Sequence, residues 1–245
     1  MNLATSVSNV GAFSEAKKIN NLIFSVINAA FNALSPRMSY HASRGEMNKV
    51  SYYFEKGLYN SALFSVIIVS GILATAPDFV DFFYGDGYQA VTNVLRMLGL
   101  PLTIIPVIAL LNNGILIPLK KDKNYLVSIL IILIFGIIFN LILDPYFGAV
   151  GAAASYLLSQ LLSLIYLGFI CRKIIKPLQI LSTIILTFIL IIGNTLLINS
   201  VSQSLIIENS VISFIVKGFL SVLVSTILLG CSTYLLKMKK TSKNF

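Results

Sequence analysis

The stretch "NNLIFSVINAAFNALSPRMS", residues 20–39, is apolar enough to enter a lipid bilayer, yet it repeats Asn or Ser every three or four residues. At the helical rotation of 100° per residue, these residues fall within about 40° of Asn21. The stretch therefore predicts a membrane helix with one polar edge. Pro36 is expected to end or kink this helix, and Arg37, on the opposite side, is expected to reach the cytoplasmic head groups. The edge consists of Ser14, Lys17, Asn21, Ser25, Asn28, Asn32, Ser35 and Ser39.

Composition places the whole chain in a membrane. Of its 245 residues, 57% are hydrophobic and only 11% are charged, whereas soluble domains carry about 25% charged residues. Crossing the hydrocarbon core takes about 20 mostly apolar residues, and runs of that length are too long for barrel strands. The sequence thus predicts an all-α polytopic membrane protein with about seven transmembrane helices. The runs are roughly 17–36, 58–77, 94–119, 124–143, 149–171, 178–199 and 211–236.

Basic residues are distributed unevenly between the joints that separate these runs. When the joints are assigned to alternate sides, 14 of the 18 Lys and Arg residues fall on one side. Because Lys and Arg in short loops favour the cytoplasm, we expect the C-terminus inside and the N-terminus outside. This pattern explains the net charge of +9 without nucleic acid as a partner. An outside start with no signal peptide predicts that part of the protein is missing upstream.

Two interpretations of the polar edge remain open. The amides and hydroxyls can hydrogen-bond a neighbouring helix, because an unpaired amide in hydrocarbon is costly. Alternatively, they can face a water-filled cavity, and such residues often mark a substrate path. An edge that runs through the whole membrane favours the cavity.

Other polar residues inside the runs are weaker candidates. Arg96 and Asn113 belong to the run 94–119, where Pro106 predicts a kink. In one interpretation this helix is a gate or a cavity wall, with Gly99 and Thr103 on the same side as Arg96. In the other, Arg96 lies at the membrane interface and the amides hydrogen-bond neighbouring helices. Lys217 is expected to extend to the outer head groups. Serines in its row are expected to pack against another helix, namely Ser213, Ser221 and Ser225.

Some chemistry is not expected from this sequence. Two cysteines and one histidine, His41, have no metal-ligand spacing and His41 has no evident partner, so neither a metal nor a cofactor is expected. All nine acids fall at helix ends or in joints, although a proton or sodium relay usually needs a carboxylate inside the membrane. Amides, hydroxyls and a few cations suit a sugar with an anionic head better than a cationic drug.

Three stretches, taken in order, carry a family resemblance. They are "VGAFSEAKKI" followed by "LSPRMSYHAS", then "FFYGDGYQAVTNVLRMLGL", then "DPYFGAVGAAASYLLSQ". The set resembles the oligosaccharide flippases of the polysaccharide transporter family, the Wzx-type proteins of the MOP superfamily. It covers the first five runs. Members of that family have fourteen helices in two lobes around a central cavity, and this chain would be helices eight to fourteen.

The resemblance also implies a domain division and a function. Residues 1–172 would be the C-terminal transporter lobe, and residues 173–245 two additional helices with a basic cytoplasmic tail. The implied function is translocation of an undecaprenyl-pyrophosphate-linked oligosaccharide, such as an O-antigen or capsule repeat unit, across the bacterial cytoplasmic membrane. Implied partners are this lipid-linked oligosaccharide, membrane lipids, a missing N-terminal lobe or second chain, and other polysaccharide assembly proteins.

Eight residues are expected to line the substrate cavity, with Lys18 and Arg96 as weaker contacts of the pyrophosphate. They are Lys17, Lys18, Asn21, Ser25, Asn28, Asn32, Arg96 and Asn113.

Three alternatives to an oligosaccharide flippase stay open. One is a multidrug exporter of the same superfamily, driven by a cation gradient. Another is an inactive remnant, or a half-transporter that pairs with a second chain. The third is a polytopic glycan polymerase or acyltransferase, which would need catalytic carboxylates or histidines on sizeable loops. Because such loops are not found here, the chain is not expected to be an enzyme.

Overall fold

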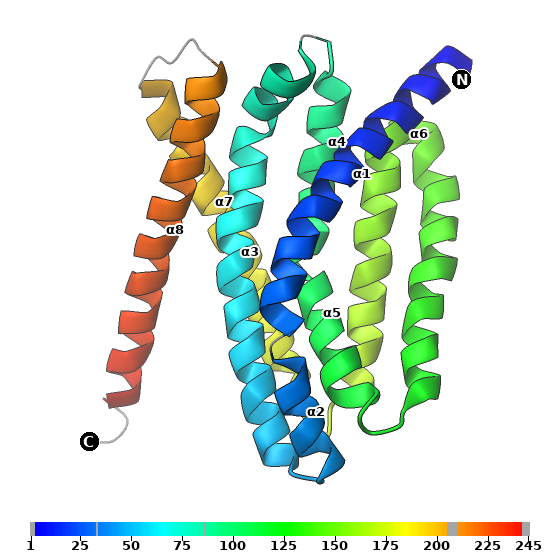
Figure 1. Cartoon of the computed structure of the whole chain (residues 1–245), viewed down its shortest axis with the longest axis vertical. Coiled ribbons are helices and arrows are strands. Elements are labelled where there is room, and N and C mark those ends of the chain that lie inside the picture. The colour runs from blue at the N-terminus through cyan, green and yellow to red at the C-terminus, as the bar shows by residue number, and fades with distance from the viewer. Residues whose placement is uncertain (1–2, 33, 86, 205–209, 242–245) are drawn as a thin grey trace.

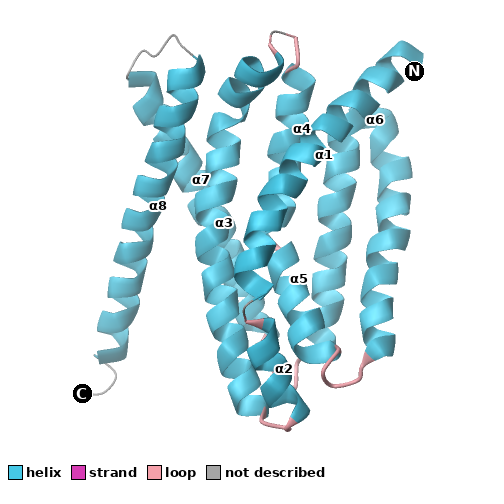
Figure 2. Cartoon of the chain, viewed as in Figure 1, coloured by secondary structure: helices cyan, strands magenta, loops and turns pink. Residues whose placement is uncertain are grey.

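The computed structural model describes residues 3–32, 34–85, 87–204 and 210–241, and all regular elements in these ranges are helical (Figures 1 and 2). This result confirms the predicted all-α fold. In chain order the elements are α1 (Leu3–Asn32), α2 (Ser35–Ser43), α3 (Met47–Tyr84), α4 (Gln89–Gly99), the 3₁₀ turn η1 (Leu100–Thr103), α5 (Ile105–Leu111), the π turn η2 (Asn112–Leu116), α6 (Asp122–Ile170), α7 (Pro177–Ser204) and α8 (Ser210–Thr241).

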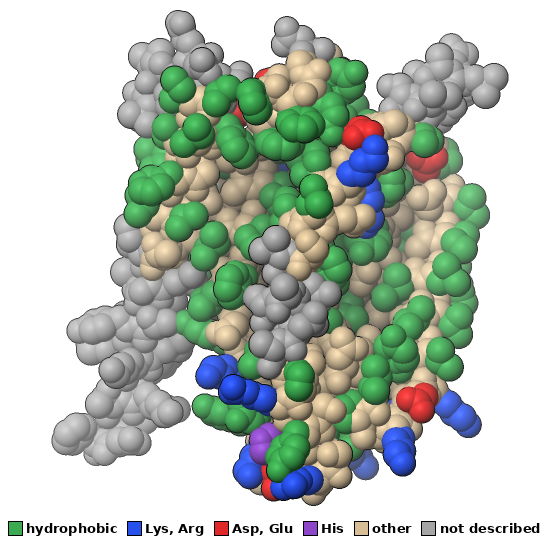
Figure 3. Space-filling view, in the orientation of Figure 1, with side chains coloured by type: hydrophobic (Ala, Val, Ile, Leu, Met, Phe, Trp, Pro, Cys, Tyr) green, Lys and Arg blue, Asp and Glu red, His purple; other side chains and the backbone are tan. Residues whose placement is uncertain are grey.

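By length and composition, four described segments could each cross a membrane. They are Met47–Tyr84, Gln89–Leu116, Asp122–Ile170 and Pro177–Ser202, and the described part of α8, Val211–Thr226, is a shorter apolar helix. Lys and Arg side chains gather at the end of the bundle where α2 joins α3, and a smaller charged group lies over α1 near the other end (Figures 1 and 3).

The first predicted helix is broken where Pro36 indicates. α1 ends at Asn32, and Pro36 lies in the first turn of α2, where its missing N–H costs no helical hydrogen bond. α1 starts at Leu3, well before the expected residue 17. His41, expected without a partner, in fact places Nδ1 2.6 Å from a carboxylate oxygen of Glu46 in the turn that follows α2.

α6 is two antiparallel helices joined at the predicted "DPYFG" joint (Figure 1). Gly148 has a φ of +56°, a left-handed conformation that glycine adopts without steric cost. A Cβ at Gly151 would collide with the backbone carbonyl of Leu143. The glycine at position 151 therefore allows the two halves of α6 to pack closely just after the reversal.

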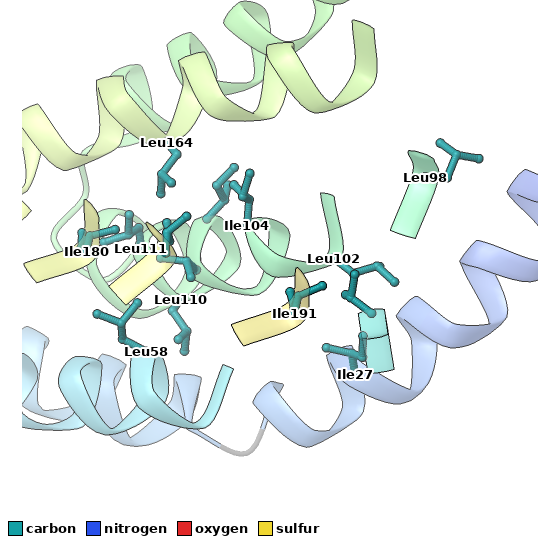
Figure 4. Close-up of a cluster of buried hydrophobic side chains, with 14 of the residues drawn as sticks. Ile27, Leu58, Leu98, Leu102, Ile104, Leu110, Leu111, Leu164, Ile180 and Ile191 are labelled. Atoms are coloured by element: carbon teal, nitrogen blue, oxygen red, sulfur yellow. The ribbon is translucent and has the colours of Figure 1, made fainter. Parts of the chain in front are cut away.

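The run 94–119 forms the kinked centre of the bundle, and it divides into α4, η1, α5 and η2. It packs between α3 and α6, and its large apolar side chains meet those of neighbouring helices in the core (Figure 4). The kink is as predicted. However, Gly99, Thr103 and Pro106 are buried in this core rather than facing a cavity, because a central helix is covered on both sides.

α7 and α8 pack mainly against α3 and against each other. They are continuous helices along the side of α3 that faces away from α1 (Figure 1). The proposed domain boundary between residues 172 and 173 falls in the turn between α6 and α7. The division into two units stays a prediction.

Candidate functional site

At Asn21 and Ser25, the polar edge of α1 faces away from the rest of the described chain. One side of α1 packs on α4 and α6 through Ala12 and Ala16, which are buried. On the other side, Asn21 and Ser25 are exposed. Ser25 uses its hydroxyl locally, donating a hydrogen bond to the carbonyl oxygen of Leu22 at 2.7 Å. Neither residue acts as packing glue between the described helices.

Asn20 and Asn21 are adjacent in α1, yet their side chains have opposite surroundings. Asn20 is only 2% exposed, and its carbonyl oxygen Oδ1 has no hydrogen-bond partner among the described residues. Asn21, the next residue, is exposed. Sequence reasoning missed Asn20, although its rotation of 100° from the polar edge pointed to the packed side.

Two lysines lie at the start of the edge, and they have different surroundings. Lys17 Nζ lies 3.8 Å from the centroid of the Tyr156 ring, a cation–π contact with the second half of α6. Lys18 forms an ion pair with Glu15 at 2.7 Å, and its side chain is 66% exposed. Glu15 also accepts a hydrogen bond from the Tyr84 hydroxyl at 3.1 Å.

A cavity of about 420 Å³ opens beside Lys17, between α1 and the two halves of α6. Its walls are mostly apolar, with Phe13 from α1 and Tyr156 from α6. Asn140, Ser155 and Ser159 add polar atoms to the lining. Sequence analysis did not select these residues, because single polar residues in an apolar helix have no distinctive spacing.

Arg96 and Asn113 do not join the edge. Arg96 is half-buried in α4, and its Nε donates a hydrogen bond to the carbonyl oxygen of Leu73 at 3.0 Å. Asn113 is exposed in η2, near the end of the bundle opposite the start of α1 (Figure 1). The side chains of Asn28 and Asn32 lie outside the part of the chain that the structure describes. The structure thus groups Lys17, Lys18, Asn21 and Ser25 on one helix face; their role stays a prediction.

Lys217 does not extend to the head groups as expected. Its Nζ lies 2.7 Å from Asp78 Oδ2, and each side chain is 15% exposed. Asp78 lies inside α3 rather than at a helix end, so the statement that every acid lies at a helix end or in a joint was wrong. The sequence could not pair these residues, because 139 positions separate them. The serine row beside Lys217 does pack as expected, with Ser213, Ser221 and Ser225 buried.

Asn194 of α7 is a second polar residue that sequence reasoning passed over. It is 0% exposed, and its Nδ2 donates hydrogen bonds to Ser70 Oγ at 2.7 Å and Ser225 Oγ at 2.6 Å. One amide thus connects α7 to both α3 and α8. Within the described ranges, no group of three or more His, Cys, Asp or Glu residues could hold a metal ion.

No family model matches the chain, and no curated protein matches it in sequence. Among solved structures, the chain is similar to "Lipid II flippase MurJ, inward closed conformation", with a TM-score of 0.72 and 16% sequence identity. The match covers 93% of this chain and 48% of that chain, so this chain spans about half the length of the flippase. At this identity the likeness shows the fold. It does not single out the Wzx-type proteins. The chain is a multi-pass membrane protein that has the fold of about half of this flippase.

Proposed function

We propose that this chain is one half of a flippase that moves an undecaprenyl-pyrophosphate-linked oligosaccharide, such as an O-antigen or capsule repeat unit, across the bacterial cytoplasmic membrane. The observation that carries the proposal is the exposed polar edge of α1, at Asn21 and Ser25, on a helix whose opposite side is packed. The fold likeness to a flippase named for lipid II supports a lipid-linked substrate.

The physical task explains why such an edge is needed. A pyrophosphate and several sugars cannot cross hydrocarbon, because each buried charge or unpaired polar group costs several kcal/mol. Asn21 and Ser25 offer an amide and a hydroxyl to the sugars. The ammonium of Lys18 is exposed but paired with Glu15 at 2.7 Å, so it is a weaker contact for the pyrophosphate. The lipid chain stays in the bilayer throughout.

A second half, in the same or another chain, would cover the polar edge and close the cavity. Rocking of two such halves about a fixed site gives alternating access. We place the basic end of the bundle, where α2 joins α3, in the cytoplasm, because Lys and Arg favour that side (Figure 3). The N-terminus is then outside and the C-terminus inside. Arg96 is a weaker contact in this proposal, since its Nε is already bonded to Leu73.

Thiol accessibility tests the proposal directly. In the assembled protein in its native membrane, with Cys171 and Cys231 replaced by Ala, single cysteines at positions 21 and 25 should react with a water-soluble maleimide. Asn20→Cys is the matched control, because position 20 is buried in the same turn. Lipid-linked oligosaccharide added to the membranes should slow labelling at 21 and 25.

The outcomes separate the alternatives. Cysteines at 21 and 25 that resist the reagent as well as the one at 20 would show that the edge faces lipid or another helix, and the cavity would be refuted. Labelling that slows with a cationic drug but not with the lipid-linked oligosaccharide would favour an exporter instead. Single cysteines at 28 and 32 extend the same test to the cytoplasmic half of α1.

A further inference from the structure

The outer part of α3 contains a proline inside a helix. Pro77 has no N–H, so the helix cannot make the usual hydrogen bond to the carbonyl four residues earlier, at Leu73. Arg96 of α4 donates its Nε to that same carbonyl oxygen at 3.0 Å. The segment beyond the proline, residues 78–84, is therefore joined to the body of α3 through a weakened turn, and α4 supplies the missing donor.

This outer segment is held by a polar contact at each end. At its base, Asp78 pairs with Lys217 of α8 at 2.7 Å. At its tip, the Tyr84 hydroxyl donates to Glu15 of α1 at 3.1 Å. The segment thus links α8 to the first half of α1, the helix that carries the polar edge.

The ion pair is better explained by positioning than by stability. Removing two charges from water costs about as much as their attraction returns, so a buried pair adds little net stability. A role in fixing one arrangement among alternatives is the best-attested use of such pairs. The carboxylate and the ammonium are both 15% exposed, and they come from helices that otherwise meet through small and apolar side chains.

Space for movement lies next to the segment. A cavity of about 620 Å³ separates its inner side from α1, lined by Phe79, Phe83 and Tyr84 of α3, Phe214 of α8 and Leu22 of α1. Phe79 contacts both Phe83 and Phe214, with ring centroids 5.6 Å apart in each case. Because aromatic contacts of this kind tolerate several geometries, the charged pair is the contact in this region that defines one position.

We propose that the Asp78–Lys217 pair is a positioning device, which sets the outer segment of α3 and, through Tyr84 and Glu15, the outer end of α1. In the flippase the segment swings on the Pro77 turn when the cavity opens or closes to the outside. This movement rests on the proposed function. The position that the ion pair gives to the segment is independent of that function, and it can be measured without a transport assay.

Distances between spin labels test the device. Labels at Leu22 and Phe83, both exposed on walls of the 620 Å³ cavity, report the position of the segment relative to α1 in the full chain in lipid nanodiscs. Cys171 and Cys231 are replaced by Ala in this background. The unsubstituted pair should give one narrow distance distribution. Asp78→Asn should broaden it, whereas Asp81→Asn, which removes an exposed acid from the same segment, should not.

Two further variants keep the test decisive if Asp78→Asn folds poorly. The double variant Asp78→Asn/Lys217→Met leaves no unpaired charge, and it should still lose the narrow distribution. The exchange Asp78→Lys/Lys217→Asp should restore it. A narrow, unshifted distribution in the double variant would overturn the proposal. Because this readout is independent of thiol labelling at Asn21, failure here and failure of the proposed cavity are distinguishable.

Discussion

Asn21 and Asn194 are the same residue type in helices of one membrane protein, and they are held in opposite ways. Asn21 is exposed on the outer face of α1. Asn194 is 0% exposed where α7 meets α3 and α8, and it donates two hydrogen bonds to serine hydroxyls. A polar side chain in a membrane must find either protein partners or water. The buried amide therefore belongs to assembly of the bundle, whereas the exposed one takes no part in it, and only in the proposed function does it contact a substrate.

The largest expected difference between the two asparagines is in their contribution to the stability of the fold. Asn194→Ala should lower the free energy of unfolding by about 1–2 kcal/mol, because two interhelical hydrogen bonds of roughly 0.6 kcal/mol each, and at most about 1.7, are lost together with packing. Asn21→Ala should leave stability unchanged within error. Unfolding of the full chain by SDS in mixed micelles measures both variants.

Asn20 supplies a matched control for the buried amide. Its carbonyl oxygen is buried with no partner among the described residues, so Asn20→Leu should change the free energy of unfolding by less than about 1 kcal/mol or stabilise the protein slightly. If Asn194→Ala and Asn20→Leu destabilise the bundle equally, burial alone decides the cost. The two hydrogen bonds that Asn194 Nδ2 donates would then add nothing to burial, because Oδ1 of both Asn194 and Asn20 is buried with no partner among the described residues.

More of the fold than of the candidate site could be predicted from the sequence. Apolar runs, Pro36, Pro106 and the glycines near "DPYFG" act locally, so helices, kinks and the reversal in α6 could be predicted. The polar edge of α1 was also a local pattern. The structure leaves Asn21 and Ser25 exposed, and their place in a substrate cavity stays a prediction. Sequence periodicity gives the direction of a side chain on its own helix, but not what lies opposite it.

The contacts that were missed all depend on helix packing. Asp78 with Lys217, Asn194 with Ser70, and Lys17 with Tyr156 each join residues far apart in the chain. Arg96 was selected as a weaker contact of the pyrophosphate or as an interfacial arginine. Its Nε in fact donates to a carbonyl left without its helical donor by Pro77 of another helix. Such pairs become visible only when the topology is known.

A smaller effect is expected where the polar edge touches the bundle. The Lys17 ammonium lies over the Tyr156 ring at 3.8 Å, and such contacts contribute about 0.5–1 kcal/mol at partly exposed sites. Tyr156→Leu should lower the free energy of unfolding by about that amount, whereas Tyr156→Phe, which keeps the ring, should not. The same SDS titration measures both. Equal losses in the two variants would assign the effect to the hydroxyl of Tyr156 and not to its ring.

The smallest expected effect is at the basic end, where the paired groups His41 and Glu46 are partly exposed. The hydrogen bond from His41, and next the one from Lys49, hold the pKa of the Glu46 carboxyl below its ordinary value. A lowered pKa means that the folded state favours the carboxylate. Its contribution is complete above the unfolded pKa of about 4.3, and it is lost as pH falls through the lower folded value.

Amide hydrogen exchange in the turn between α2 and α3 reports this loss. Protection of the Glu46 N–H, which donates to the His41 carbonyl at 3.0 Å, should decrease as the pH is lowered below about 4, after correction for intrinsic exchange. Glu46→Gln should remove that pH dependence, whereas Glu55→Gln, at an exposed acid further along α3, should leave it intact. The change should be small because water reaches and screens the partly exposed Glu46 carboxylate. A drop in protection that persists in Glu46→Gln would assign the pH dependence to another group, and the His41–Glu46 pair would then contribute nothing measurable to the turn.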